Sequence, residues 1–202
     1  QDIEGAPMVI ISDKYKDMGP VCMGKVISGC FMKNDSFVVM PIQKTFKISN
    51  ILSLDDEEKQ MAKIGENIKL RLIGADEQDL LGGYVLCDSL NLCPVGRIFD
   101  AQLIIIECKS IISAGYKAII HVHNVVDEVT LVAIKKLMDR KTQQWQITAP
   151  RFVRQDNICV VRLSMNNVQC IAPISKIPYL GRFSIRDEGK TVAFGKILKV
   201  IS

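Results

Sequence analysis

The sequence predicts an all-β chain made of two small antiparallel β-barrels in tandem. Glycine or proline recurs at short intervals along the 202 residues, and short runs rich in valine and isoleucine lie between them. Several of these runs alternate apolar and polar residues with a period of two, as half-buried strands do. Residues 1–95 carry a net charge of −4 and residues 96–202 carry +8. This change of sign predicts two domains with different partners.

The first half contains three clear strand candidates. Ile68–Leu72 alternates with three apolar side chains on one face, whereas Phe37–Met40 and Tyr84–Cys87 are typical of strands buried on both faces. Asp55–Gln60 is a charged run, and we interpret it as a solvated turn between strands. Pro20 has no N–H to donate to a ladder, so we expect it on an edge strand or at a bulge.

The boundary between the domains is predicted at Leu92–Gly96, a Leu-Cys-Pro-Val-Gly run where the charge changes sign. We therefore expect one barrel over residues 1–95 and a second over residues 96–202. The strand candidates of the second half are Phe99–Cys108, Lys117–Val126, Ile158–Leu163 and Thr191–Ile201.

One segment of the second half fits two secondary structures. Five apolar residues would line one face of a helix, namely Val125, Val126, Val129, Val132 and Ala133. Most of them are β-branched, however, and β-branched residues favour strands. We therefore predict a strand.

The last strands are predicted to form a hairpin over 180–197. Arg182–Arg186 and Thr191–Leu198 alternate, and Asp187-Glu188-Gly189 between them indicates a tight turn, because glycine supplies positive φ. On the first strand, Phe183 and Ile185 share one face, and Arg182, Ser184 and Arg186 share the other. We expect the apolar pair in the core. The arginines either meet a partner or pair with Asp187 or Glu188.

No catalytic, cofactor or metal site is predicted for this chain. It contains no GxxxxGK[ST] phosphate loop, no GxGxxG, no HExxH and no GxSxG. His121 and His123 would share one strand face, but a zinc site needs further ligands, so hydrogen-bonded strand histidines are expected. Asp55-Asp56-Glu57-Glu58 offers carboxylates in one shared wet environment, which does not suit acid–base catalysis.

The remaining features indicate a cytoplasmic protein. The seven cysteines have irregular spacing without a CxxC pair, so we expect reduced, mostly buried thiols. No apolar run approaches the length of a membrane helix, so no membrane partner is expected. Gln1–Glu4 is polar and acidic and includes no initiator methionine, so we expect a piece of a longer protein.

Six phrases, in order along nearly the whole chain, carry a resemblance to one family. They are DKYKDMG at 13–19, GENIKLRL at 65–72, GYVLCD at 83–88, KSII at 109–112, PRFV at 150–153 and GRFSIRDEGKTVAFGK at 181–196. Together they resemble the second and third domains of eukaryotic class-two polypeptide chain release factor GTPases, which have elongation factor Tu-like β-barrels. The chain departs from this pattern at Pro20-Val21-Cys22 and at 139–149 around Trp145.

The resemblance implies a non-catalytic part of a translation-termination GTPase, whose GTP and Mg²⁺ belong to a GTPase domain that this sequence lacks. It implies that the third domain binds the class-one release factor and that the second faces the small ribosomal subunit. The corresponding domains of a ribosome-rescue GTPase, or of elongation factor one alpha binding aminoacyl-tRNA, are the alternatives. No DNA partner is expected. Around the final hairpin, the candidate contacts with the release factor are Tyr179, Phe183 and Ile185 as an apolar centre and Arg182, Arg186 and Asp187 as a rim. If Phe183 and Ile185 fill the barrel instead, only the arginine face and Tyr179 remain for the partner.

Overall fold

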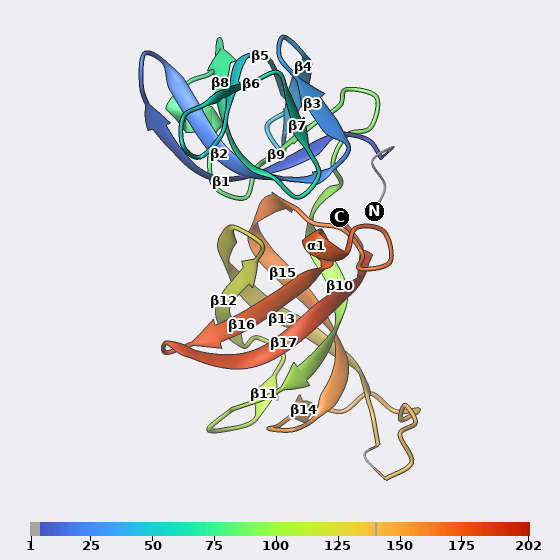
Figure 1. Cartoon of the computed structure of the whole chain (residues 1–202). Coiled ribbons are helices and arrows are strands. Elements are labelled where there is room, and N and C mark those ends of the chain that lie inside the picture. Colours follow the sequence, from blue (N-terminus) through green and yellow to red (C-terminus); the bar gives the residue numbers. More distant parts are fainter. Residues whose placement is uncertain (1–4, 140) are drawn as a thin grey trace. The chain divides into compact units, whose positions relative to one another are not determined.

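The computed structural model describes residues 5–139 and 141–202. Gln1–Glu4, named above for their polarity, therefore lie outside the described residues. The chain divides into two compact units, residues 1–94 and 95–202, and the predicted boundary at 95/96 lies one residue from this division. Both units are built almost entirely from antiparallel strands (Figure 1). The prediction of an all-β fold is confirmed.

Unit 1 is a ring of six strands with short additions. The ring runs β4-β9-β1-β2-β8-β5 and closes because β5 also pairs with β4. Its elements are β1 (Met8–Lys16), β2 (Pro20–Ser28), β3 (Cys30–Met32), β4 (Ser36–Met40), β5 (Lys44–Leu52), β6 (Glu58–Lys59), β7 (Met61–Lys63), β8 (Asn67–Ile73), the 3-10 helix η1 (Glu77–Asp79) and β9 (Val85–Cys87). The inward side chains form one core, in which Phe31 and Phe37 meet edge to face at 6.0 Å.

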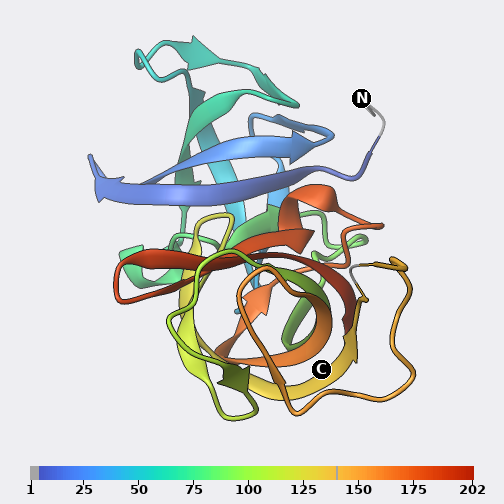
Figure 2. The ribbon, with the colours of Figure 1, turned by 90° about the horizontal axis from the view of Figure 1, so that it is seen from below.

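Unit 2 is a closed barrel in the order β10-β15-β13-β12-β16-β17, and Figure 2 shows this ring end-on. Its elements are β10 (Val95–Ile105), β11 (Ile112–Ser113), β12 (Lys117–Val122), β13 (Val125–Leu137), β14 (Phe152–Val153), β15 (Ile158–Cys170), the short helix α1 (Pro178–Gly181), β16 (Arg182–Asp187) and β17 (Lys190–Val200). Alternate residues of each barrel strand fill a single core. The segment that fitted both a helix and a strand is β13, so that prediction is confirmed.

Three local predictions are corrected. Lys117–Val126 is not one strand, because the chain reverses after Val122, where His123 takes a left-handed φ of 43°. The charged run Asp55–Gln60 is only partly a turn, because Glu58–Lys59 pairs with the end of β5 as β6. Pro20 begins a strand inside the ring, and the ladder with β8 starts one residue later, so no N–H is required of it.

Candidate functional site

Strand β16 separates its side chains between the barrel core and the surface. Phe183 and Ile185 are 5% and 4% exposed, and Phe183 meets Phe99 edge to face with ring centroids 5.7 Å apart. Arg182 and Arg186 are exposed on the other face. Phe183 and Ile185 therefore belong to the barrel core, as the period of two predicts. They do not form the apolar centre of a surface contact.

A glycine on the neighbouring strand makes room for this core. Gly195 lies opposite Phe183 in the β16–β17 ladder. A Cβ atom at Gly195 would stand 2.4 Å from Cζ of Phe183 and 2.6 Å from Cδ2 of Leu103, closer than real contacts permit. Strand β17 can approach β16 and β10 here only because residue 195 has no side chain.

The tip of the β16–β17 hairpin is a two-residue turn. Glu188 and Gly189 have φ values of 49° and 76°, the pattern of the type I′ turn that suits the twist of a hairpin. Arg186 donates from Nη2 to the carbonyl oxygen of Gly189 at 3.0 Å. Within residues 5–139 and 141–202, neither Arg182 nor Arg186 forms an ion pair with Asp187 or Glu188, so this alternative for the arginines is wrong.

The hairpin tip is fixed to the segment between β10 and β12. The hydroxyl of Tyr116 donates to Oδ2 of Asp187 at 2.8 Å, and burial, reinforced by this carboxylate, raises the pKa of Tyr116. Lys190 pairs with Glu107 at 3.2 Å, and Lys109 lies 3.9 Å from Glu188. These residues and their neighbours line a polar cleft of about 170 Å³. Asp187 thus accepts a hydrogen bond within the barrel, so its carboxylate is less available to a partner protein.

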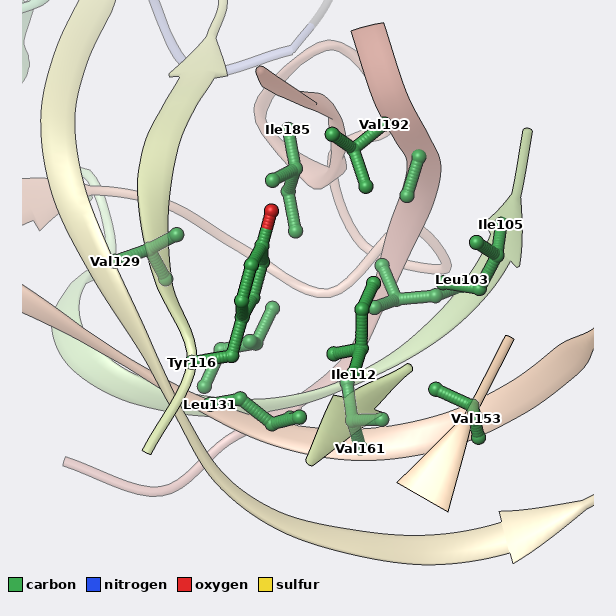
Figure 3. A pocket seen from close by; sticks show the side chains of 12 residues that line it. Leu103, Ile105, Ile112, Tyr116, Val129, Leu131, Val153, Val161, Ile185 and Val192 are labelled. Atoms are coloured by element: carbon green, nitrogen blue, oxygen red, sulfur yellow. The ribbon is translucent and has the colours of Figure 1, made fainter. Parts of the chain in front are cut away.

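Tyr116 also closes one side of a small cavity inside the barrel. In Figure 3 its ring lies between Leu131, Val129 and Ile185, and its oxygen points toward the hairpin. The other lining side chains are apolar, and the cavity holds about 20 Å³, room for about one water molecule. It is a packing defect of the core and is too small for an organic ligand.

Arg182 lines a shallow groove on the outer face of the barrel. The groove measures about 340 Å³, and its lining residues are Gln102, Ile104, Ile174, Arg182, Phe194, Gly195 and Lys196. We call it the β17 groove. Ile104 and Phe194 face each other across the β10–β17 ladder and are 45% and 52% exposed. Arg182 and Lys196 lie opposite each other in the β16–β17 ladder, and both cations stand beside this apolar pair.

The sequence alone does not identify Phe194 and Ile104 as surface residues. Val192, Ala193 and Phe194 are consecutive apolar residues, and the alternation does not tell which of them points outward. The structure buries the first two and exposes the third. Lys196 is the sequence signal for this arrangement, because residues two apart on a strand share a face and a lysine favours the solvent side. Tyr179, an expected contact, is exposed on α1 directly before Arg182.

The described residues that line this groove include no histidine or cysteine. His121 lies on β12, whereas His123 lies in the turn, so the prediction that they share a strand face is wrong. Nε2 of His123 lies 2.9 Å from the Cys170 carbonyl oxygen, and burial lowers the pKa of this histidine. Five cysteines are buried as predicted, and burial raises the pKa of the Cys22 thiol to about 12. In the described parts of the chain, no three His, Cys, Asp or Glu side chains cluster as metal ligands.

Comparisons with known proteins agree on one family. Residues 98–198 match the family model described as GTP-eEF1A C-terminal domain-like. The eukaryotic peptide chain release factor GTP-binding subunit of Debaryomyces hansenii is 35% identical over 199 residues, which are 98% of this chain and 28% of that protein. The subunit of the same name from Ogataea pini is 37% identical over 96% of this chain and 26% of its own length. This chain therefore spans little more than a quarter of these relatives.

Solved structures agree as well. A crystal structure of sup35 complexed with GDP superposes on the whole chain with a TM-score of 0.93 at 32% identity, and this chain covers 49% of it. A structure of sup35 complexed with GMPPNP gives the same values. Within the described residues, no helix has the length and apolar character needed to cross a membrane.

Proposed function

Because the chain belongs to the GTP-eEF1A C-terminal domain-like family, we propose that it forms the two C-terminal β-barrels of a translation-termination GTPase. In this proposal, unit 2 binds the class-one release factor, unit 1 faces the small ribosomal subunit, and the protein acts in the cytoplasm. The names of the relatives support the role in termination. The sequence printed here contains no phosphate-binding loop, so GTP and Mg²⁺ are assigned to another domain of the whole protein.

The observation that carries the proposal is the chemistry of the β17 groove. Protein interfaces combine an apolar centre with a polar rim, and aromatic and arginine side chains often supply most of the binding energy. Phe194 and Ile104 provide an exposed apolar floor, and Arg182 and Lys196 border it. Arg186 is exposed on the same strand face as Arg182, and Tyr179 is exposed on α1, which precedes that strand. The groove is too shallow and open for a small ligand to be enclosed.

The net charge of unit 2 indicates the sign of the charge on the partner surface. Residues 96–202 carry +8, and cations border the groove, so we expect the partner surface to be acidic with at least one apolar side chain. Complementary charge speeds association and makes it sensitive to salt. The apolar floor is expected to slow dissociation instead.

The test is a calorimetric titration of the class-one release factor into the 202-residue chain. Phe194→Ala is expected to weaken binding by about 30-fold, because truncating a central aromatic anchor costs about 2 kcal/mol or more. Arg182→Glu is expected to weaken it as well, with the larger effect at low salt. Val126→Ala, which truncates an exposed apolar residue on β13, is the matched control and should bind as the wild type does.

Two results would contradict the proposal. Absence of wild-type binding would refute release factor recognition by this chain. Wild-type binding that neither Phe194→Ala nor Arg182→Glu weakens would remove the β17 groove from the interface. If the chain instead bound tRNA only when it is aminoacylated, and not the release factor, the elongation factor alternative would be favoured.

A further inference from the structure

The outer face of unit 2 carries a second feature, next to the β17 groove and chemically different from it. Four cations stand around one carboxylate on neighbouring strands β13, β15, β10 and β17, which Figure 1 labels. The cations are Lys135, Lys136, Arg162 and Lys199, and the carboxylate is Asp100; we call this set the basic belt. Asp100 lies opposite Arg162 in one ladder and opposite Lys199 in the other. The belt is therefore continuous across the strands.

Irregular strand pairing places these lysines on one face. In a regular strand, one of two consecutive side chains points inward. The β13–β15 register shifts between Ile134 and Lys136, and both Lys135 and Lys136 are exposed. The β10–β17 register shifts next to Asp100, and both Leu198 and Lys199 are exposed. Bulges characteristically re-aim side chains in this way, so the accumulation of charge is built into the backbone.

The carboxylate within the belt compensates only one of the four cations. Arg162 donates from Nε to Oδ1 of Asp100 at 2.8 Å and from Nη2 to Oδ2 at 3.2 Å. This two-point contact fixes the guanidinium and leaves its other N–H groups available to a ligand. Across the described parts of the chain, Lys135, Lys136 and Lys199 have no carboxylate within ion-pair distance. Three positive charges therefore remain unpaired on a convex surface.

We propose that the basic belt binds the phosphate backbone of structured RNA. A protein interface needs an apolar centre, but the belt contains no aromatic residue, and the apolar Val132 and Leu198 beside it are exposed singly. Phosphate contacts need only cations and supply most of the affinity for nucleic acids. The choice of RNA among polyanions rests on the proposed function, because a termination factor works among RNA. The charge argument does not depend on that function.

The geometry sets the size of the expected contact. Three spacings of about 4.8 Å separate β13 from β17 across the belt, so it spans about 14 Å. Each lysine that neutralises a phosphate contributes a little less than one to the slope of log K against log salt. Removing the three unpaired lysines is therefore expected to lower the magnitude of this slope by about 2 to 3.

The experiment measures fluorescence anisotropy of a labelled RNA hairpin with the 202-residue chain over a series of KCl concentrations. The belt variant carries Lys135→Gln, Lys136→Gln and Lys199→Gln. The control carries Lys16→Gln, Lys47→Gln and Lys63→Gln, which change the net charge equally at exposed positions of unit 1. The belt variant is expected to lose at least tenfold in affinity at low salt and to show the reduced slope. The control should retain the wild-type slope, and circular dichroism verifies that both variants fold.

Parallel titrations separate the alternatives. An equal loss in the control would overturn the proposal, because total charge rather than the belt would then explain binding. It would also be overturned if the belt variant bound RNA normally but lost the release factor or phosphatidylserine vesicles. Loss of RNA with the release factor retained supports the belt. If the wild type bound RNA through the belt but not the release factor, only the function proposed above would fail.

Discussion

Replacement of Gly195 by alanine tests whether close packing between β17 and β16 sets the stability of unit 2. The new Cβ would lie 2.4 and 2.7 Å from two ring carbons of Phe183 and 2.6 Å from Leu103. Phe183 cannot swing away, because its ring is buried against Phe99. Overpacking of a filled core typically costs about 1–3 kcal/mol. We expect Gly195→Ala to lower the free energy of opening of unit 2 by this amount.

The measurement is amide hydrogen exchange of peptides from β16 and β17 over a urea series, which reports local free energies of opening. Peptides from unit 1 serve as an internal reference. Lys196→Ala changes the neighbouring exposed residue and is expected to alter stability by less than about 0.5 kcal/mol.

A second substitution identifies the cause. In a Phe183→Leu background the ring is gone, so Gly195→Ala should cost at least about 1 kcal/mol less than in the wild type. Two outcomes would refute the reasoning. One is a Gly195→Ala variant as stable as the wild type. The other is a double variant whose loss of stability equals the sum of the losses in the two single variants.

Three further predictions concern polar contacts and the hairpin turn. Tyr116→Phe removes the hydrogen bond to Asp187 and should cost about 1 kcal/mol, with faster hydrogen exchange at the hairpin tip; unchanged exchange would show that the bond does not hold the tip. Arg162 lowers the pKa of Asp100, so this pair stabilises the fold above the unfolded-state pKa of about 3.9 and is lost as pH falls through the lower folded-state value. Urea midpoints measured across acidic pH should therefore fall less for Asp100→Asn than for the wild type. Equal pH dependence of the two midpoints would contradict the assignment. Glu188→Gly should stabilise the chain by up to about 1 kcal/mol in urea denaturation, because a non-glycine residue adopts positive φ there at a cost, and a loss of stability would indicate that side-chain contacts dominate.

The resemblance visible in the sequence reached the family without the structure. Its phrases lie mostly at turns and strand starts, where backbone geometry restricts residue choice. Gly189 at the hairpin tip is an example, since its φ of 76° favours glycine. The same local logic indicated strands at Ile68–Leu72 and Arg182–Arg186, because a period of two depends only on neighbouring residues.

Local patterns failed where the chain turns without glycine or proline. His123 and Asn124 reverse the chain inside a run of β-branched residues, and Asn124 is the single turn-favouring residue there. The pairing of Glu58–Lys59 with β5 likewise depends on a strand elsewhere in the sequence.

The sequence by itself determined the all-β class, the position of the charge boundary and the inward direction of Phe183 and Ile185, because alternation and composition are local properties. Only the tertiary structure decided which exposed residues meet. Phe194 joins Ile104 and Arg182 through ladder register, and Lys199 joins Arg162 through a bulge. Register is a relation between distant strands, and a shift of one residue would place other side chains on the surface. The candidate surfaces of this protein are therefore products of pairing, and no single segment contains them.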